Sequence, residues 1–79
     1  MSGKDTKQGF RKIPPILTQR QIEVLALIKL GETDKAIGYK LGISGAAVSN
    51  RISHGILSRL GASNRAHAVY IALKRGIIS

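Results

Sequence analysis

Apolar side chains recur three or four residues apart in four stretches of this chain, and polar residues or glycines separate the stretches. Such spacing places the apolar side chains on one face of a helix. The pattern predicts helices over residues 18–30, 33–41, 45–60 and 64–75, joined by loops of two to four residues. No stretch alternates between apolar and polar residues as a strand does. The sequence therefore predicts an all-α fold of four helices.

The first predicted helix carries a wide apolar stripe, which suits the central helix of a small bundle. Its start is a capping box, in which Thr18 offers its hydroxyl to one unpaired amide and Gln21 reaches back to another. Ile16 or Leu17, just before the cap, can pack onto Ile22. We expect the stripe to consist of Ile22, Val24, Leu25, Ala26, Leu27, Ile28 and Leu30.

Polar residues mark the starts of the later helices. Asp34 in the first turn of the second helix and Lys40 in its last turn suit the helix dipole. Ser63 or Asn64 caps the fourth helix, and the two isoleucines after Gly76 are expected to fold back onto the core. The predicted helix ends are Gly31, Gly42, Gly61 and Gly76.

The chain is organised around residues 36–61, and especially around the break at residues 41–44. Gly42 can adopt the left-handed conformation that closes a helix, and Ser44 can cap the next helix. A side chain at Gly38 would point at this second helix, so glycine there favours a close crossing. Two helices joined in this way form a helix-turn-helix, whose second member can enter the DNA major groove, although short helix pairs also serve as plain packing units. The second helix carries the apolar row Val48, Ile52, Ile56 and Leu60.

The charge of the chain indicates what kind of partner it binds. Its 79 residues include 13 Lys and Arg against 4 Asp and Glu, which gives a net charge of +9 and a pI of about 10.8. Such a balance favours a polyanion, because neutralising phosphates releases counterions. The alternative is a basic protein with no such partner. Only Phe10, Tyr39 and Tyr70 are aromatic, too few for a base-stacking platform, so double-stranded DNA is the expected partner.

Several other classes of protein are disfavoured. The chain has no cysteine, hence no disulfide framework and no thiolate metal site. No apolar run approaches the ~18–20 residues of a membrane span, and no signal-peptide hydrophobic region is present, so a cytoplasmic location is expected. His54 and His67 lack acidic or sulfur partners at ligand spacing. Without a nucleophile–base pair, a glycine-rich phosphate loop or a carboxylate pair, we expect no metal, no cofactor and no enzymatic activity.

The first 15 residues differ in composition from the rest. They carry four basic residues against Asp5 alone and cannot bury enough apolar surface to order themselves. Pro14 and Pro15 favour an extended approach to the domain. We expect a flexible basic tail over 1–15, followed by a DNA-binding domain over 16–79. The tail either solubilises the protein or acts as an arm along the phosphates or in a minor groove.

A series of short motifs runs from residue 17 to residue 78. They are Leu17-Thr18-x-Arg20, Glu23-Val24-Leu25, Leu30-Gly31, Lys35-x-Ile37, Leu41-Gly42-Ile43-Ser44, Val48, Leu60-Gly61, Asn64-Arg65, Ala68-Val69 and Gly76-Ile77-Ile78. In their order and nearly in their spacing, they resemble the LuxR/FixJ-type (GerE-like) helix-turn-helix domain of bacterial transcription regulators. The resemblance implies a four-helix domain whose third helix reads the major groove and whose fourth helix pairs two protomers.

Three features depart from the family pattern. Gln21 stands where the family usually has Glu, which still completes a capping box but removes a charge. The surface of the third helix has Ala46, Ala47, Ser49 and Arg51. At these four positions the family commonly has Lys, then Thr, then Lys or Arg, and then His. Beyond Arg51 this helix is one residue longer than the pattern. The extra residue rotates the remainder of the helix by about 100° unless a π-bulge near Gly55 absorbs it.

The third helix supplies the candidate base-reading residues. Its face opposite the apolar row is small and polar, and the resemblance implies that Ser49, Asn50 and Ser53 face the groove. Asn50 is the strongest candidate, because an amide can bond N6 and N7 of adenine together. Ser49 and Ser53 permit close approach and contacts through water, and Ala46 can touch thymine methyl groups. Each of these residues is also compatible with an ordinary solvated helix.

Basic and hydroxyl side chains around this helix are candidates for contacts to DNA phosphates. Each alone is equally an ordinary solvated charge or cap, but as a set they match the net charge. Arg65 is expected instead to tie the corner between the third and fourth helices, and Arg20 to pair with Glu23. The phosphate candidates are Thr33, Lys35, Lys40, Ser44, Arg51 and Arg59.

The fourth helix indicates a homodimer. Val69, Tyr70 and Leu73 form more apolar surface than a lone small domain needs to expose. Part of this stripe must pack inside, and the remainder predicts an interface between two copies. A two-fold dimer would require two DNA half-sites, about one DNA turn apart or a little less.

We interpret the chain as a sequence-specific, double-stranded DNA-binding transcription regulator. The alternative from another class is a small helical adaptor that binds RNA polymerase or another regulator through the fourth helix. Such an adaptor needs no outward basic residues around the third helix. A fragment resembling sigma-factor region four shares the helix-turn-helix, but Asn64-Arg65 and residues 76–78 fit the LuxR-type ending better.

Overall fold

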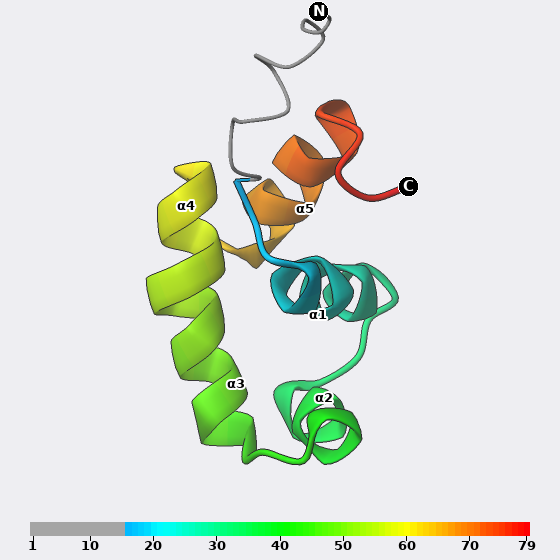
Figure 1. Ribbon diagram of the computed structural model, residues 1–79, viewed down its shortest axis with the longest axis vertical. Coiled ribbons are helices and arrows are strands. Elements are labelled where there is room, and N and C mark those ends of the chain that lie inside the picture. The colour runs from blue at the N-terminus through cyan, green and yellow to red at the C-terminus, as the bar shows by residue number, and fades with distance from the viewer. Residues whose placement is uncertain (1–15) are drawn as a thin grey trace, which may run out of the picture.

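The computed structural model describes residues 16–79, and all regular structure within that range is helical. The prediction of a flexible tail over residues 1–15 concerns residues outside this range. The all-α prediction is confirmed, and α3, η2 and α4 follow one another without a break as one long helix (Figure 1). The elements are α1 (Gln19–Lys29), α2 (Asp34–Leu41), α3 (Gly45–Arg51), η2 (Ile52–Leu57), α4 (Ser58–Leu60) and α5 (Arg65–Lys74).

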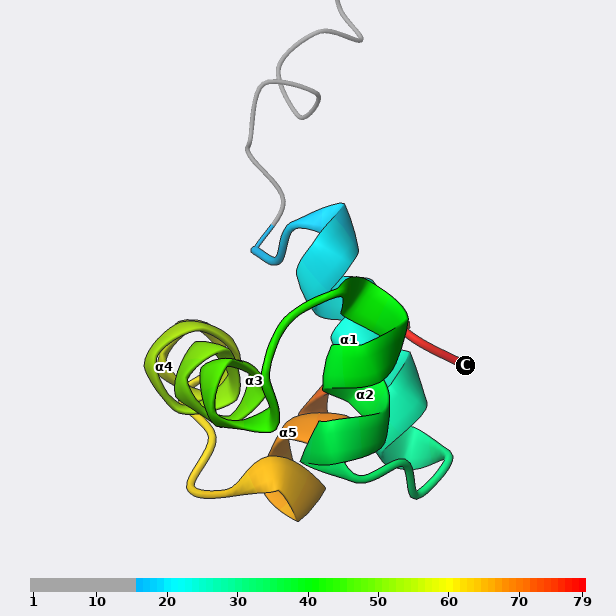
Figure 2. The ribbon, with the colours of Figure 1, turned by 90° about the horizontal axis from the view of Figure 1, so that it is seen from below.

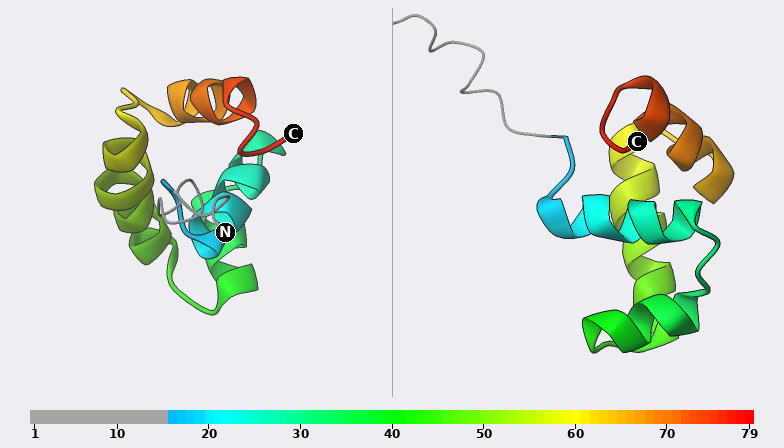
Figure 3. Two further views of the ribbon diagram at one scale, coloured as in Figure 1. Left: turned by 45° about the horizontal axis from the view of Figure 1, so that its top comes forward. Right: turned by 90° about the vertical axis from the view of Figure 1, so that its right-hand side faces the viewer.

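The other three helices pack against this long helix. α2 lies beside its first turns, α1 crosses its middle, and α5 lies across the end near α4 (Figure 3). Seen along the long helix, α1 and α2 lie on the same side of it (Figure 2). The opposite side of the long helix is therefore free of covering elements in the described chain. The core between the helices consists of Leu17, Val24, Leu25, Ile37, Val48, Ile52, Ile56, Leu60, Ala68, Ala72 and Ile78.

Side chains cap the helix starts as the sequence predicts. The Gln21 amide donates to Thr18 Oγ1 at 3.1 Å, and the Thr18 amide donates to Gln21 Oε1 at 2.8 Å, which completes the capping box. Of the two candidates for the last helix, Asn64 is the cap, and its Oδ1 accepts from the His67 amide at 2.9 Å. The predicted ends are also confirmed, since Gly31, Gly42, Gly61 and Gly76 all have positive φ.

The placement of Leu30 in the apolar stripe of α1 is wrong. Its side chain is 72% exposed, because α1 ends at Lys29 and Leu30 is only its C-cap. At 100° per residue, a position five residues after the buried Leu25 lies about 140° away from it around the helix. The stripe therefore ends at Ile28, two residues earlier than the sequence pattern indicates.

Gly38 is buried where α2 meets the turn that leads into α3. A Cβ atom at this position would lie 2.5 Å from the carbonyl oxygen of Ile43 and 3.0 Å from the carbonyl carbon of Ser44. The expected need for glycine is confirmed, although the obstacle is the backbone of the turn rather than the body of the second helix. The Ile43 amide also donates to the Gly38 carbonyl at 2.9 Å, which holds the turn in this close position.

Of the two outcomes that the sequence left open for the extra residue, the structure shows the second, because a π-helix, η2, surrounds Gly55. In a regular α-helix, residues four apart drift by about 40° per step, so a row of four would wind about 120° around the helix. The wider turn of a π-helix takes up an extra residue and offsets part of that drift. This explains why the whole apolar row remains buried, namely Val48, Ile52, Ile56 and Leu60.

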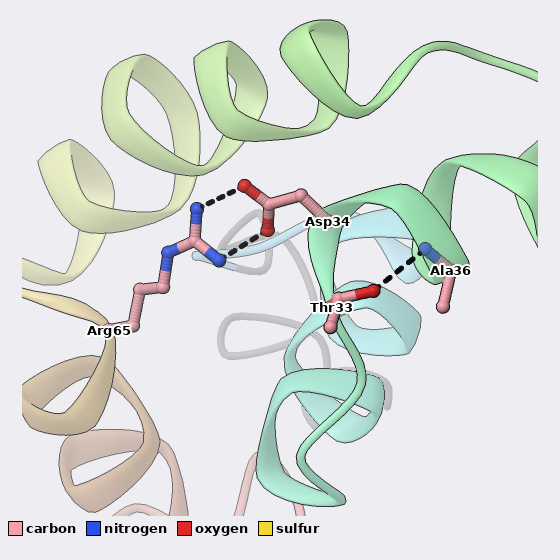
Figure 4. Close-up of polar contacts among 4 residues, drawn as sticks. All are labelled: Thr33, Asp34, Ala36 and Arg65. Carbon is pink, nitrogen blue, oxygen red and sulfur yellow. Dashed lines mark hydrogen bonds and ion pairs between the residues drawn. The ribbon is translucent and has the colours of Figure 1, made fainter.

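An ion pair joins the start of α2 to the start of α5. Arg65 donates both terminal nitrogens to the Asp34 carboxylate, and the contact between Arg65 Nη2 and Asp34 Oδ2 measures 2.6 Å (Figure 4). Arg65 thus ties the corner after the long helix, as expected, and its partner is the first residue of α2. The neighbouring Thr33 hydroxyl caps the same helix by accepting from the Ala36 amide (Figure 4).

Acid is expected to weaken this ion pair. The hydrogen bond from Arg65 lowers the pKa of the Asp34 carboxyl, partial burial opposes that shift, and the guanidinium charge adds to it. Because the pKa is lower in the folded state, the pair stabilises the fold above about pH 4 and its contribution is lost as the pH falls through the folded-state pKa. Asp34→Asn should cost about 1 kcal/mol or less at pH 7, since the side chains are 38% and 26% exposed. Urea unfolding at several pH values should show this difference vanishing in acid, and a constant difference would contradict it.

Candidate nucleic-acid interface

The outer face of the long helix carries the predicted base-reading residues. Ala46, Asn50 and Ser53 are exposed, and Ser49 is half-buried at the edge of the same face. Asn50 lies one helical turn after Ala46, and Ser53 three residues further on, so the three side chains share one side of the helix. The structure therefore brings the four candidates together on one exposed surface. Their contacts to bases remain predictions.

His54 is also exposed, one helical turn after Asn50. Its Nδ1 lies 3.2 Å from the backbone carbonyl oxygen of Asn50. A carbonyl oxygen can only accept, so Nδ1 must carry the proton and Nε2 is the ring nitrogen left for a ligand. The bond fixes the ring beside Asn50, in the π-helical segment that the extra residue of this helix creates.

Two hydroxyl groups lie at the helix starts that flank the turn. Thr33 Oγ1 accepts from the Ala36 amide at 3.1 Å, and Ser44 Oγ accepts from the Ala47 amide at 3.0 Å. Both hydroxyls use an oxygen lone pair in these caps, so each keeps its proton to donate. The caps are therefore compatible with the predicted contacts to phosphates.

The predicted basic residues have different surroundings. Lys35 and Arg51 are exposed and have no carboxylate partner within residues 16–79. Lys40 lies 3.5 Å from Glu32 Oε2, and the guanidinium of Arg59 donates to the Ile16 carbonyl at 3.3 Å. Neither of these two contacts was foreseen: the first joins the loop before α2 to the last turn of that helix, and the second joins residues 43 apart along the chain.

A hollow of about 410 Å³ lies between the first turns of α1 and the middle of the long helix. Its walls combine cationic and amide side chains with an apolar floor, and none of the lining residues is acidic. Sequence reasoning missed it, because its two sides come from segments about thirty residues apart. The lining residues are Thr18, Arg20, Gln21, Val24, Leu41, Asn50, Arg51, His54, Gly55 and Ile56.

The outer face of α5 carries the predicted dimer residues. Tyr70 is 58% exposed and Leu73 is 42% exposed, whereas Val69 packs partly against the core. The stripe thus divides between the interior and the surface as expected, and its role as an interface remains a prediction.

Residues 16–79 offer neither a clustered set of metal ligands nor a membrane-spanning helix. No group of three His, Cys, Asp or Glu residues in this part of the chain lies close enough to hold a metal ion. No described helix combines the length and the apolar character that crossing a bilayer requires.

Comparison with known proteins agrees with this geometry. The family model described as "Bacterial regulatory proteins, luxR family" (GerE) matches residues 15–72. The chain is 40% identical over 63 residues to the transcriptional regulatory protein YdfI of Bacillus subtilis (strain 168), a match that covers 80% of this chain and 29% of YdfI. It is 39% identical over 62 residues to the spore germination protein GerE of the same organism, which covers 78% of this chain and 82% of GerE.

A solved structure shows the same fold. The response regulator ChrA of a heme-sensing two-component system superposes with a TM-score of 0.73 and 34% sequence identity, over 90% of this chain and 35% of ChrA. The chain therefore spans about a third of ChrA and of YdfI, and most of GerE.

Proposed function

The chain belongs to the luxR family of bacterial regulatory proteins, a family of DNA-binding transcription regulators, and we propose that it binds double-stranded DNA sequence-specifically with α3 and η2 in the major groove. The single observation that carries this proposal is the outer face of the long helix. That face is free of covering elements within residues 16–79 and presents Asn50 between small side chains. A helix with such a face can approach base edges closely.

The surroundings of this face support the proposal. Three of the phosphate candidates lie where α2 meets α3, namely Lys35 and the hydroxyls of Thr33 and Ser44. Arg51 lies on the long helix itself. In a helix-turn-helix, the first helix crosses the DNA backbone while the second lies in the groove. Charged and hydroxyl groups at these positions would then position the protein on the phosphates, and the outer face would read the bases.

The exposed part of α5 supports a homodimer. Tyr70 and Leu73 provide an aromatic and an aliphatic side chain on one surface, and a two-fold dimer would pair this surface with itself. Two copies of the long helix would then contact two half-sites of a palindrome.

Selection of binding sites from a random duplex library tests the proposed function. The protein should enrich a palindrome, and the spacing of its halves should correspond to about one DNA turn. Enrichment of a single half-site would support sequence-specific binding and contradict the homodimer. If all duplexes are recovered equally, and recovery decreases as the salt concentration rises, the protein contacts only the DNA backbone. This result would contradict the proposal.

Removing the Lys35 charge is expected to weaken binding to all duplexes alike. Lys35→Gln should lower the steepness of log K against log salt by about 0.9, the value for one phosphate contact. Fluorescence anisotropy at several salt concentrations measures this slope. Lys74→Gln, at the end of α5, removes the same charge away from the turn and should leave the slope nearly unchanged. Equal changes in both variants would indicate a general charge effect instead of a contact at Lys35.

A further inference from the structure

We propose that the hollow between α1 and η2 receives a backbone phosphate of the DNA strand that borders the long helix on the side of Arg51. This inference rests on the proposed function and adds to it a second backbone contact, formed by a helix outside the helix-turn-helix. The proposed function gives no role to Arg20 or Gly55, and this inference assigns one to each.

The chemistry of the hollow suits a phosphate. Arg20 and Arg51 supply guanidinium groups from its two sides, and the side-chain amide of Gln21 adds Nε2 as a further donor. No carboxylate lies among the lining residues. Arginine forks match phosphate oxygens in geometry as well as in charge.

Arg20 keeps donors for such a ligand. Its Nε lies 3.4 Å from Glu23 Oε1 in an exposed ion pair. A guanidinium has five N–H donors, so this contact leaves others available. An exposed pair of this kind contributes at most about 1 kcal/mol and can share its cation with a phosphate.

The position of the hollow relative to the reading face supports a strand beside it. At 100° per residue, Ser49 and Arg51 lie on opposite sides of Asn50. On the Ser49 side, Gly45 packs close to the start of α2, since a Cβ there would lie 3.3 Å from the Lys35 amide nitrogen. On the Arg51 side, the hollow opens between the helix and α1. A helix in the major groove has a phosphate strand along each side, so the start of α2 would border one strand and the hollow, which Leu41 at the end of α2 also lines, would border the other.

Gly55 keeps the hollow open. A Cβ atom added to it would lie 3.1 Å from Gln21 Nε2, across the space between the two helices. The extra residue of this helix is absorbed in the same segment, as η2. A glycine in the widened turn therefore leaves room between α1 and the long helix that a larger side chain would fill.

The first test removes charge from the hollow. Arg20→Gln should lower the steepness of log K against log salt by about 0.9 and weaken binding to every duplex, the selected site and scrambled sequences alike. Lys74→Gln is the matched control. Because the lost ion pair is exposed, the melting temperature should change by only a few degrees. An unchanged slope for Arg20→Gln, with wild-type protein binding normally, would overturn the inference.

The second test fills the hollow without changing any charge. Gly55→Leu should lose affinity to a similar extent as Arg20→Gln, whereas Lys74→Gln, outside the hollow, should not reproduce this loss. If Gly55→Leu does not fold, the Arg20 measurement still decides the question. The double variant Arg20→Gln/Gly55→Leu should be no weaker than the weaker single variant, because both remove one phosphate contact. Wild-type affinity in the folded leucine variant would contradict the inference, and a wild-type protein that binds no duplex would contradict the proposed function itself.

Discussion

Replacing Gly38 by alanine is expected to destabilise the domain by about 1–3 kcal/mol or more, the range for overpacking a filled interior. The new Cβ atom would lie 2.5 Å from the Ile43 carbonyl oxygen, a contact that requires the backbone to move. The turn resists such movement, because the Ile43 amide is bonded to the Gly38 carbonyl and Ser44 caps α3. Urea unfolding followed by circular dichroism measures the loss, which corresponds to a decrease in melting temperature of about 4–8 °C per kcal/mol for a domain of this size.

Gly55→Ala is the matched control for this prediction. It makes the same substitution in the long helix, but its Cβ atom would lie 3.1 Å from Nε2 of the Gln21 side chain and not against backbone, so a small shift of that side chain relieves the contact. Alanine favours a helix over glycine by up to about 1 kcal/mol, so this variant should be as stable as the wild type or slightly more stable. Equal destabilisation by both substitutions would show that the fit at the turn is not the cause of the loss at Gly38.

The sequence predicts the fold of this chain well wherever the determining contacts are local. The capping box of Thr18 and Gln21 joins residues three apart, and a glycine such as Gly42 ends a helix through its own backbone conformation. The π-helix could be predicted because the family pattern sets the expected length of the helix and Gly55 marks where it widens. The placement of Leu30 fails because a position five residues after Leu25 falls outside the buried face and because the helix ends just before it.

The surroundings of the candidate site could be predicted only in part. The outer face of the long helix follows from its periodicity, so the exposure of Asn50 and Ser53 was predictable. The partner of Arg65 was not, because Asp34 lies 31 residues earlier in the chain and meets it only through the packing of two helices. The hollow beside η2 was missed for the same reason, since no periodicity within α1 or the long helix indicates the space between them.

Asn50→Ala is expected to weaken binding to the preferred DNA site by about 1–3 kcal/mol, or roughly 5–150-fold, and to relax the base preference at one position of each half-site. The loss should be confined to that position, because the side-chain amide is the group that can bond a base edge in two places. The bond between His54 and the Asn50 carbonyl involves the backbone and survives the substitution. The variant therefore removes the amide without releasing the neighbouring ring.

Competition binding with duplexes that carry each of the four base pairs at every position of the selected site measures this effect. Lys35→Gln is the contrasting variant, since losing a phosphate contact lowers the affinity for all of these duplexes and leaves their ranking unchanged. If Asn50→Ala also weakened all duplexes equally, the amide would act on the backbone rather than on a base. An unchanged affinity and ranking would remove Asn50 from the interface, and the reading of bases would then depend on Ser49, Ser53 and Ala46.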